Sequence, residues 1–311
     1  MINRVLLRIK ILQMLYAHYK GDGNSVKSTV KELFHSIEKT YELYFHLFQL
    51  SVEVTRYAEQ KIDSRKNKLH PSEEDLNPNT RFIDNAFVKQ VAQNKCIQDF
   101  LSEHKISWAN NQDTVKLVYD LVVESIYYAE YMNKEKNDYP ADKDIWRKIF
   151  TKIILPNEDF YDSIEEQSIY WTDDLDIVVS FVIKTIKRFT AENGKSIELL
   201  PMFKDNEDKE FALDLIQNAI KNEAEYRTLI DDHTRNWELD RIAFMDILIM
   251  QLAIAEIMTF PTIPINVTLN EYIEISKSYS TQKSGNFING ILDNIVKELK
   301  SNNKVIKVVK I

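Results

Sequence analysis

Residues 3–19 read NRVLLRIKILQMLYAHY and predict the first helix of the chain. Four apolar side chains recur at the spacing of one helix face: Val5, Ile9, Leu12 and Tyr16. Arg4 and Arg8 lie four residues apart on a different face. Gly21 and Gly23 follow directly and predict the end of the helix. The apolar face has no partner nearer in sequence, so we expect this helix to pack against helices from the C-terminal end.

The last third of the sequence predicts four more helices. They cover about residues 209–230, 237–259, 267–279 and 284–300. Pro261 and Pro264 end the second of them, because proline cannot continue a helix. Gly290 lies inside the fourth, where a glycine costs about 1 kcal/mol relative to alanine. We therefore expect another helix to approach closely at Gly290.

The middle of the sequence is also helical in pattern. Helices are predicted over residues 25–63, 81–104 and 112–134, around Trp146, and from about Thr172 onward. Only 5 Gly and 7 Pro occur in 311 residues, and no strand pattern of useful length is present. We predict an all-α fold of about ten helices, in which the middle forms a separate helical subdomain or joins the same bundle.

Charge is distributed unevenly along the chain. The formal net charge is −8, and an acidic chain is a poor generic binder of nucleic acid, because phosphate affinity comes from clustered Lys and Arg. The first 21 residues nevertheless contain no acid, and residues 295–311 carry five lysines against one glutamate. Residues 157–177 hold eight acids and no base. We expect any phosphate contact to involve the basic ends of the chain.

The patterns of common catalytic sites are missing from the sequence. It contains neither a glycine-rich phosphate loop nor an H-E-x-x-H pattern, and it has one cysteine, which excludes an intrachain disulfide. We expect Cys96 to be a small core residue. Glu271 and Glu274 are three apart on one helix, and a solvated face explains them better than acid–base chemistry. We predict a cytoplasmic protein that is not an enzyme, with no cofactor, no metal and no membrane span.

Two places favour contact with nucleic acid. Arg4 and Arg8 are each able to fork onto a phosphate or a base edge, although a solvated helix face explains them as well. Phe287 lies at a predicted helix start, flanked by Asn286 and Asn289. This ring either packs as a hydrophobic staple or offers a face on which an RNA base stacks.

Several blocks, in order, resemble the NusB family of transcription antitermination factors. They read ILQMLY at 11–16, LDR at 239–241, DILIMQLAIAE at 246–256, IPINVTLNEYIEISK at 263–277 and SGNFINGILD at 284–293. The resemblance covers roughly residues 3–20 and 209–300. It implies a NusB-like helical bundle that is enlarged by a long helical insertion. The chain then divides into a first helix (1–20), an insertion (21–205), a C-terminal four-helix region (206–300) and a basic tail (301–311).

The resemblance also implies a function. NusB proteins bind a short single-stranded RNA element, boxA, together with a ribosomal protein called NusE. The complex helps RNA polymerase pass terminators, notably in ribosomal RNA transcription. The positions that match the family's RNA contacts, or lie beside them, are Arg4, Arg8, Gln251, Lys283, Asn286 and Phe287. The positions that match its NusE interface are Tyr16 and Asp246.

Departures from the family leave alternatives open. Val5 and Leu6 occupy positions that are often basic in the family, and Gln251 stands where many members have arginine. A protein-interaction scaffold with reduced RNA affinity is therefore a second reading. A third is a module related to the NusB-like domain of some RNA methyltransferases, although no cofactor loop accompanies it here. A homodimer is also compatible with the resemblance, since some members self-associate through the RNA-binding surface.

Overall fold

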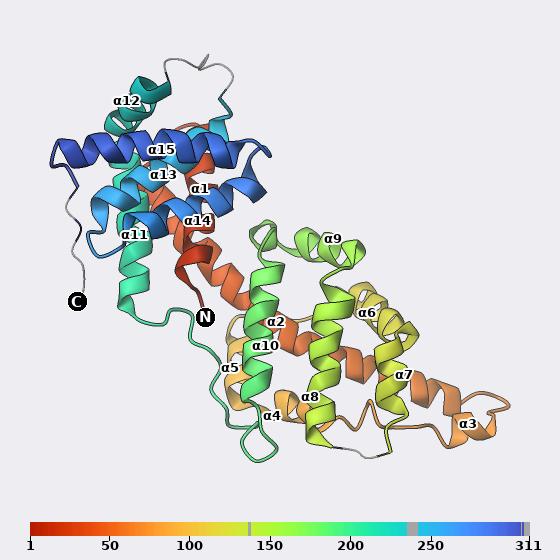
Figure 1. The fold of residues 1–311 in the computed structure, drawn as a ribbon. Helices are drawn as coiled ribbons and strands as arrows, with labels where there is room; N and C mark the ends of the chain where they lie inside the picture. The colour runs from red at the N-terminus through yellow and green to blue at the C-terminus, as the bar shows by residue number, and fades with distance from the viewer. Residues whose placement is uncertain (136–137, 235–241, 306, 308–311) are drawn as a thin grey trace. The chain divides into compact units, whose positions relative to one another are not determined.

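The computed structural model describes residues 1–135, 138–234, 242–305 and 307. These residues form fifteen α-helices, one π-helix and one 3-10 helix, and they contain no strand (Figure 1). The all-α prediction is confirmed, but the predicted number of about ten helices is too low. The block at 239–241, the predicted helix start at Trp237, and residues 306 and 308–311 of the basic tail lie outside the described residues. Within the described ranges, no helix combines the length and the hydropathy that a membrane span requires.

Short capping side chains explain the additional helices. The predicted helix at 81–104 is divided at Asn94, whose side chain accepts a hydrogen bond from the backbone of Ile97 and so begins a new helix. The predicted helix at 112–134 is divided in the same way at Ser125, whose hydroxyl accepts from the backbone of Tyr128. Each cap supplies a partner for a backbone N–H that a helix start leaves unpaired.

The chain divides into two compact units, each described by itself below. Unit 1 comprises Met1 and Glu38–Met202, and unit 2 comprises Ile2–Ile37 and Phe203–Ile311. The long helix α2 (Val26–Lys66) contributes to both units. The division of the sequence at residues 20, 205 and 300 stays a prediction.

Unit 2 is built around α13 (Phe244–Thr259), which is buried along most of its length. The helices packed against it are α1 (Arg4–Lys20), α11 (Asn206–Lys221), α12 (Glu223–Thr234), α14 (Ile265–Tyr279) and α15 (Ser284–Ser301). The predicted packing of the first helix against the C-terminal helices is confirmed by the contacts of α1 with α11 and α13. A helix that is apolar all round has to lie inside the protein, which explains the central place of α13.

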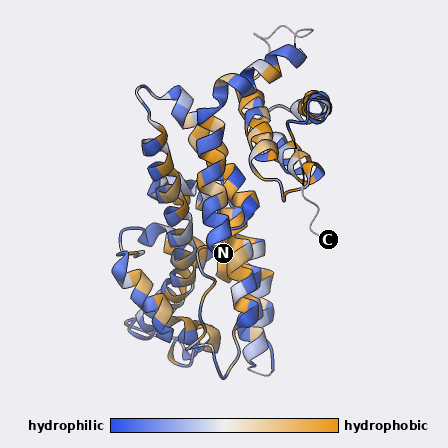
Figure 2. Ribbon diagram, turned by 90° about the vertical axis from the view of Figure 1, so that its left-hand side faces the viewer, coloured by the Kyte–Doolittle hydropathy of each residue, from blue (hydrophilic) through white to orange (hydrophobic). Residues whose placement is uncertain are grey.

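Unit 1 is a layer of shorter helices packed with the C-terminal part of α2. These are α3 (Glu73–Leu76), α4 (Ala86–Gln93), α5 (Lys95–Glu103), α6 (Gln112–Glu124), α7 (Ile126–Met132), α8 (Tyr139–Lys148), η1 (Ile149–Ile154), α9 (Glu158–Gln167), η2 (Ile169–Trp171) and α10 (Leu175–Arg188). Aromatic rings of α2 fill its core, where Tyr44 packs edge-on against Phe45 and Phe48. Figure 2 shows apolar stripes along these helices beside hydrophilic faces.

The predicted burial of Cys96 is wrong. Cys96 is exposed near the start of α5, whose buried side is formed by Ile97 and Leu101. A nine-residue helix that is half covered buries only the positions on its inner stripe, and Cys96 falls outside that stripe.

Candidate RNA interface

Arg8 of α1 lies inside unit 2. Its side chain forks onto Glu256 of α13, with Nε 2.8 Å from Oε2 and Nη2 2.7 Å from Oε1. Nη1 also reaches Glu271 Oε2 of α14 at 3.3 Å. Glu256 accepts two further hydrogen bonds, from the hydroxyls of Thr268 (2.8 Å) and Tyr272 (3.2 Å). The result is a hydrogen-bonded buried ion pair that joins three helices.

This placement does not fit the predicted role of Arg8 as a surface phosphate ligand. Arg8 is 3% exposed, and its guanidinium already binds two carboxylates. Burial alone lowers the pKa of Arg8, but the hydrogen bond and charge of Glu256 outweigh it and raise that pKa. A carboxylate within apolar α13 needs a cation, and Arg8 supplies it.

Arg4 lies one turn earlier on α1 and is partly exposed. Its Nε lies 3.2 Å from Asp208 Oδ1, and its Nη2 lies 3.8 Å from Glu207 Oε2, both at the start of α11. Its guanidinium also lies over the ring of Phe211, 5.1 Å from the centroid. The acids of α11 thus offset the positive charge that the sequence predicts at this end of the molecule.

Gln251 is buried in the middle of α13. Its Nε2 donates to the hydroxyl of Tyr19 and to the carbonyl of Ala219, both at 2.8 Å. Burial is the main cause that raises the pKa of Tyr19 to about 12. The predicted contact between Gln251 and RNA therefore does not fit, because its amide already joins α13 to α1 and α11.

Asp246, in the first turn of α13, holds the connection between α14 and α15. It accepts hydrogen bonds from the hydroxyl of Ser280 and, at 3.0 Å, from that of Ser284. The Ser284 hydroxyl also accepts from the backbone N–H of Thr281 at 3.1 Å. Asp246 is buried, so its contribution to a partner surface would be to position this turn.

The turn leads into the exposed start of α15. Lys283 and Asn286 are exposed, and Phe287 is half-buried. Lys283 makes no ion pair with another described residue. The predicted close approach at Gly290 is wrong, because an added Cβ there would meet nothing within 4 Å. Three of the predicted RNA contacts thus lie within one accessible helical turn.

A second accessible group of aromatic rings and cations lies around Phe244, the first residue of α13. Tyr16 is 40% exposed, and its ring lies 5.9 Å from that of Phe244. Lys20 Nζ lies 4.7 Å from the Phe244 centroid, and the Arg227 guanidinium lies 5.7 Å from it. Of this aromatic–cation cluster (Tyr16, Lys20, Arg227, Phe244), the sequence predicted only Tyr16 as a binding residue. Its members come from α1, α12 and α13, so no local pattern could have joined them.

The predicted residues do not form one surface. Arg8 contacts Glu256 in the C-terminal half of α13, whereas Tyr16 contacts Phe244 at its first residue, so α1 and α13 run antiparallel. With a rise of about 1.5 Å per residue, Arg4 and Tyr16 lie about 18 Å apart along α1. The cluster and the α15 start therefore lie near one end of α13, and the two arginines lie toward the other.

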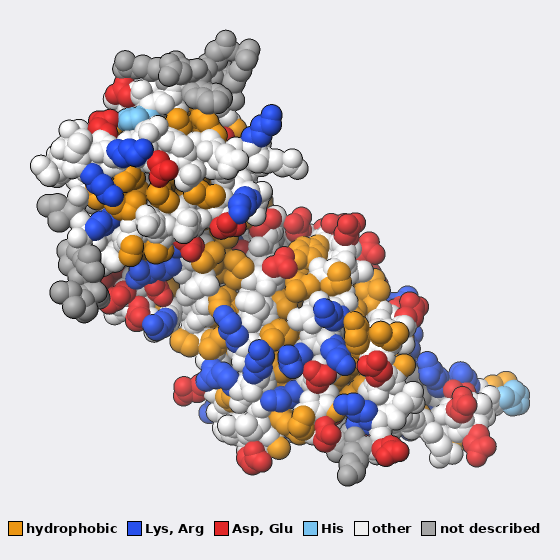
Figure 3. All heavy atoms as spheres, viewed as in Figure 1, with side chains coloured by type: hydrophobic (Ala, Val, Ile, Leu, Met, Phe, Trp, Pro, Cys, Tyr) orange, Lys and Arg blue, Asp and Glu red, His pale blue; other side chains and the backbone are white. Residues whose placement is uncertain are grey.

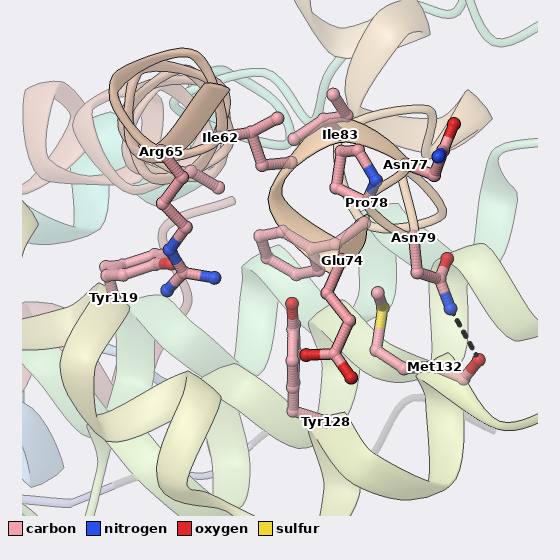
Figure 4. A pocket seen from close by; sticks show the side chains of 12 residues that line it. Ile62, Arg65, Glu74, Asn77, Pro78, Asn79, Ile83, Tyr119, Tyr128 and Met132 are labelled. Atoms are coloured by element: carbon pink, nitrogen blue, oxygen red, sulfur yellow. Dashed lines mark hydrogen bonds between the residues drawn. The ribbon is translucent and has the colours of Figure 1, made fainter. Parts of the chain in front are cut away.

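Unit 1 contains a separate pocket of about 430 Å³ (Figure 4). Figure 4 shows Arg65 beside Tyr119, and the Glu74 carboxylate beside Tyr128. Burial raises the pKa of both tyrosines. Among the described residues, no group of three or more His, Cys, Asp or Glu side chains is arranged to hold a metal ion.

Comparison with known proteins agrees with the resemblance seen in the sequence. A model of the NusB family matches residues 157–297. The transcription antitermination protein NusB of Salinibacter ruber is 35% identical over 124 residues, which cover 38% of this chain and 78% of the relative. The chain belongs to the NusB family. The matched range begins well before α11 and includes α9 and α10 of unit 1.

The share of a relative's length that matches this chain varies among members of the NusB family. The transcription antitermination protein NusB of Chloroherpeton thalassium is 45% identical over 93 residues, or 30% of this chain, and the chain spans only 44% of that relative. A solved structure of T. maritima NusB is 29% identical; the match covers 46% of this chain and 89% of that one, with a TM-score of 0.31. The N-terminal helical region outside 157–297 makes the chain longer than the matched family domain.

Proposed function

We propose that this chain is an RNA-binding transcription antitermination factor without catalytic activity. It binds boxA-type single-stranded RNA together with the ribosomal protein NusE, within the antitermination complex of RNA polymerase. It thereby supports processive transcription of ribosomal RNA in the cytoplasm. The observation that carries the proposal is the accessible first turn of α15 in a chain that belongs to the NusB family.

Lys283, Asn286 and Phe287 are the residues that we assign to RNA. An aromatic ring stacks on an unpaired base, an amide reads a base edge, and an ammonium contacts a phosphate. Asp246 supports them by holding the turn at Ser284. Arg8 and Gln251 stabilise the fold of unit 2 and are not assigned to RNA. Arg4 contacts RNA only if the RNA displaces the acids of α11.

NusE is the partner that we assign to the surface around Tyr16. The exposed Tyr16 ring, with Lys20 beside it, provides the amphipathic aromatic contact that protein interfaces favour. This surface also favours the second candidate function, a protein-interaction scaffold. Under that reading the chain binds NusE, and the burial of Arg8 and Gln251 leaves little affinity for RNA.

Fluorescence anisotropy with a labelled boxA-like RNA tests the proposal, with and without NusE and across a salt series. The variant Lys283→Gln/Phe287→Leu removes the cation and the ring from the α15 start. Lys297→Gln is the matched control, because Lys297 is an exposed lysine of the same helix. We expect NusE to tighten binding in the parent protein, and we expect only the double variant to weaken it, by about tenfold or more.

Two other outcomes decide against the proposal. If NusE binds and RNA does not under any condition, the chain is a scaffold. If both variants bind RNA like the parent, the RNA site lies elsewhere than at the start of α15.

A further inference from the structure

Unit 1 carries a basic face that the proposed boxA site does not use. Figure 3 shows Lys and Arg side chains gathered over α8 and α10. Eight cations belong to the segment after α7, to α8 and η1, and to the last turns of α10, which pack together. They are Lys134, Lys143, Arg147, Lys148, Lys152, Lys184, Lys187 and Arg188, of which Lys134, Lys143, Arg147, Lys148 and Lys187 line two adjoining hollows. So many cations on neighbouring elements are unexpected in a chain whose net charge is −8.

The structure brings four of these cations around one hollow of about 460 Å³. Lys134, Lys143, Arg147 and Lys187 line it, with Asp138 and Asp144 as the acids. The helices α8 and α10 pack against each other, so cations about forty residues apart in sequence meet there. Cations outnumber acids in the lining, which makes the hollow attractive to an anion.

Few of these cations are neutralised within the protein. Arg147 and Lys148 share Asp144, with N–O distances of 3.3 and 3.5 Å, and Lys148 Nζ also lies 3.5 Å from Glu130 Oε2. Lys143 Nζ donates to the carbonyl of Phe189 at 2.6 Å and so caps the end of α10. Five others form no ion pair with a described residue: Lys134, Lys152, Lys184, Lys187 and Arg188.

Helix stability alone does not explain the cluster. Cations in the last turn of α10 interact favourably with the helix dipole. That argument covers Lys187 and Arg188 of α10 and Lys152 in the last turn of η1, but it does not cover Lys184, which lies before the last turn of α10. The helix α9 of the same unit is meanwhile acidic, since five of its ten residues are Asp or Glu. The unit is therefore electrically polarised.

We infer that this face binds the phosphodiester backbone of RNA without reading its sequence. The inference builds on the proposed RNA binding and extends it to the helical region outside the boxA site. Lysines are compact charges on flexible stems, which contact phosphates and carry no base code. Among the described residues that line the hollow, none is aromatic. The ring of Tyr139 is covered by Lys143, and its hydroxyl donates to Gln90. RNA that contacts this face gains affinity through charge alone, whatever its sequence.

Anisotropy with a labelled homopolymer of about 30 uridines tests the inference, because this probe contains no boxA element. The variant Lys152→Gln/Lys184→Gln/Lys187→Gln is compared with Lys66→Gln/Lys95→Gln/Lys116→Gln. The control removes the same charge from exposed, unpaired lysines elsewhere on unit 1. Three lost phosphate contacts should make the salt slope shallower by about 2 and lower the affinity at about 0.1 M salt by about a hundredfold. Circular dichroism verifies that both variants stay folded.

The outcomes separate the two RNA sites. Equal effects of the two triple variants, or no effect of either, would overturn the inference. So would binding of the parent protein to vesicles containing phosphatidylserine with no binding to the uridine homopolymer. If boxA binding fails while uridine binding still depends on the basic face, only the proposed function is wrong.

Discussion

Arg8 and Glu256 show how one buried charge determines the role of another. Glu256 is completely buried within α13, and its carboxylate is satisfied by Arg8, Thr268 and Tyr272. Removing one partner of a buried pair leaves the other charge without compensation, which costs about 3–5 kcal/mol. Arg4 pairs with Asp208 at the surface, where such pairs contribute about 1 kcal/mol or less.

We therefore predict that Arg8→Ala lowers the free energy of unfolding by about 3–5 kcal/mol, whereas Arg4→Ala lowers it by less than about 1 kcal/mol. Urea titrations followed by circular dichroism measure both values. If both variants lose an equally small free energy of unfolding, Arg8 is hydrated in solution and available to bind a ligand.

His46 couples the stability of unit 1 to pH. Its ring stacks on Trp108, with centroids 3.9 Å apart, and its Nε2 lies 3.0 Å from Gln167 Oε1. Burial lowers the pKa of His46 to about 4. Because the folded pKa is below the unfolded value of about 6.5, protons bind preferentially to the unfolded chain. The stabilisation is complete above pH 6.5 and is lost as the pH falls toward 4.

We predict that His46 accounts for a loss of about 2 kcal/mol in the free energy of unfolding between pH 7 and pH 5. In His46→Phe, which retains a ring against Trp108, this part of the pH dependence should be missing. Urea titrations at the two pH values give the comparison. A variant with the same pH dependence as the parent would show that His46 binds protons equally well in the folded and unfolded chain.

The helices themselves are divided by polar caps. Asn94 and Ser125 each begin a new helix where a continuous apolar pattern predicts one longer helix. The cap decides the boundary because it pairs a backbone N–H and lets the chain change direction. Sequence periodicity indicates which face of a helix is apolar, but it does not indicate where the chain bends and a new helix begins.

Gly290 lowers the helix propensity of α15 without making room for a neighbouring helix. It lies exposed within α15, and an added Cβ would meet no atom within 4 Å. Gly290→Ala should therefore raise the free energy of unfolding by about 1 kcal/mol, since alanine favours the helix. Thermal unfolding measures the gain, with Gly23→Ala as a control in which positive φ makes the substitution unfavourable. A loss of stability in Gly290→Ala would mean that the α15 backbone bends at this position.

Across the whole chain, the distribution of charge matters more than its sum. Acids lie along α9, and cations lie over α8 and α10. Complementary fields steer association and raise on-rates, an effect that salt suppresses. A basic ribosomal partner such as NusE would be attracted to the acidic helix.

We predict that Asp162→Asn/Glu165→Gln/Glu166→Gln slows association with NusE by about tenfold at low salt and has little effect at high salt. Stopped-flow fluorescence measures the rates. Glu59→Gln/Asp63→Asn/Glu73→Gln removes equal charge from other exposed positions and is the control. If the two variants associate with NusE at identical rates, the effect comes from the net charge of the chain and not from the position of the acids on α9.

The sequence by itself determined the helical class, the start and end of α1, and the α15 block that resembles the NusB family. These features depend on local periodicity, caps and chain breakers, all of which act within a few residues. Only the tertiary structure decided that Arg8 is a structural cation, since its partner Glu256 is 248 residues away. It also decided the burial of Gln251 and Asp246 and assembled the basic face from α8 and α10. A helix pattern specifies which face is apolar, but which helix covers that face depends on packing over the whole unit.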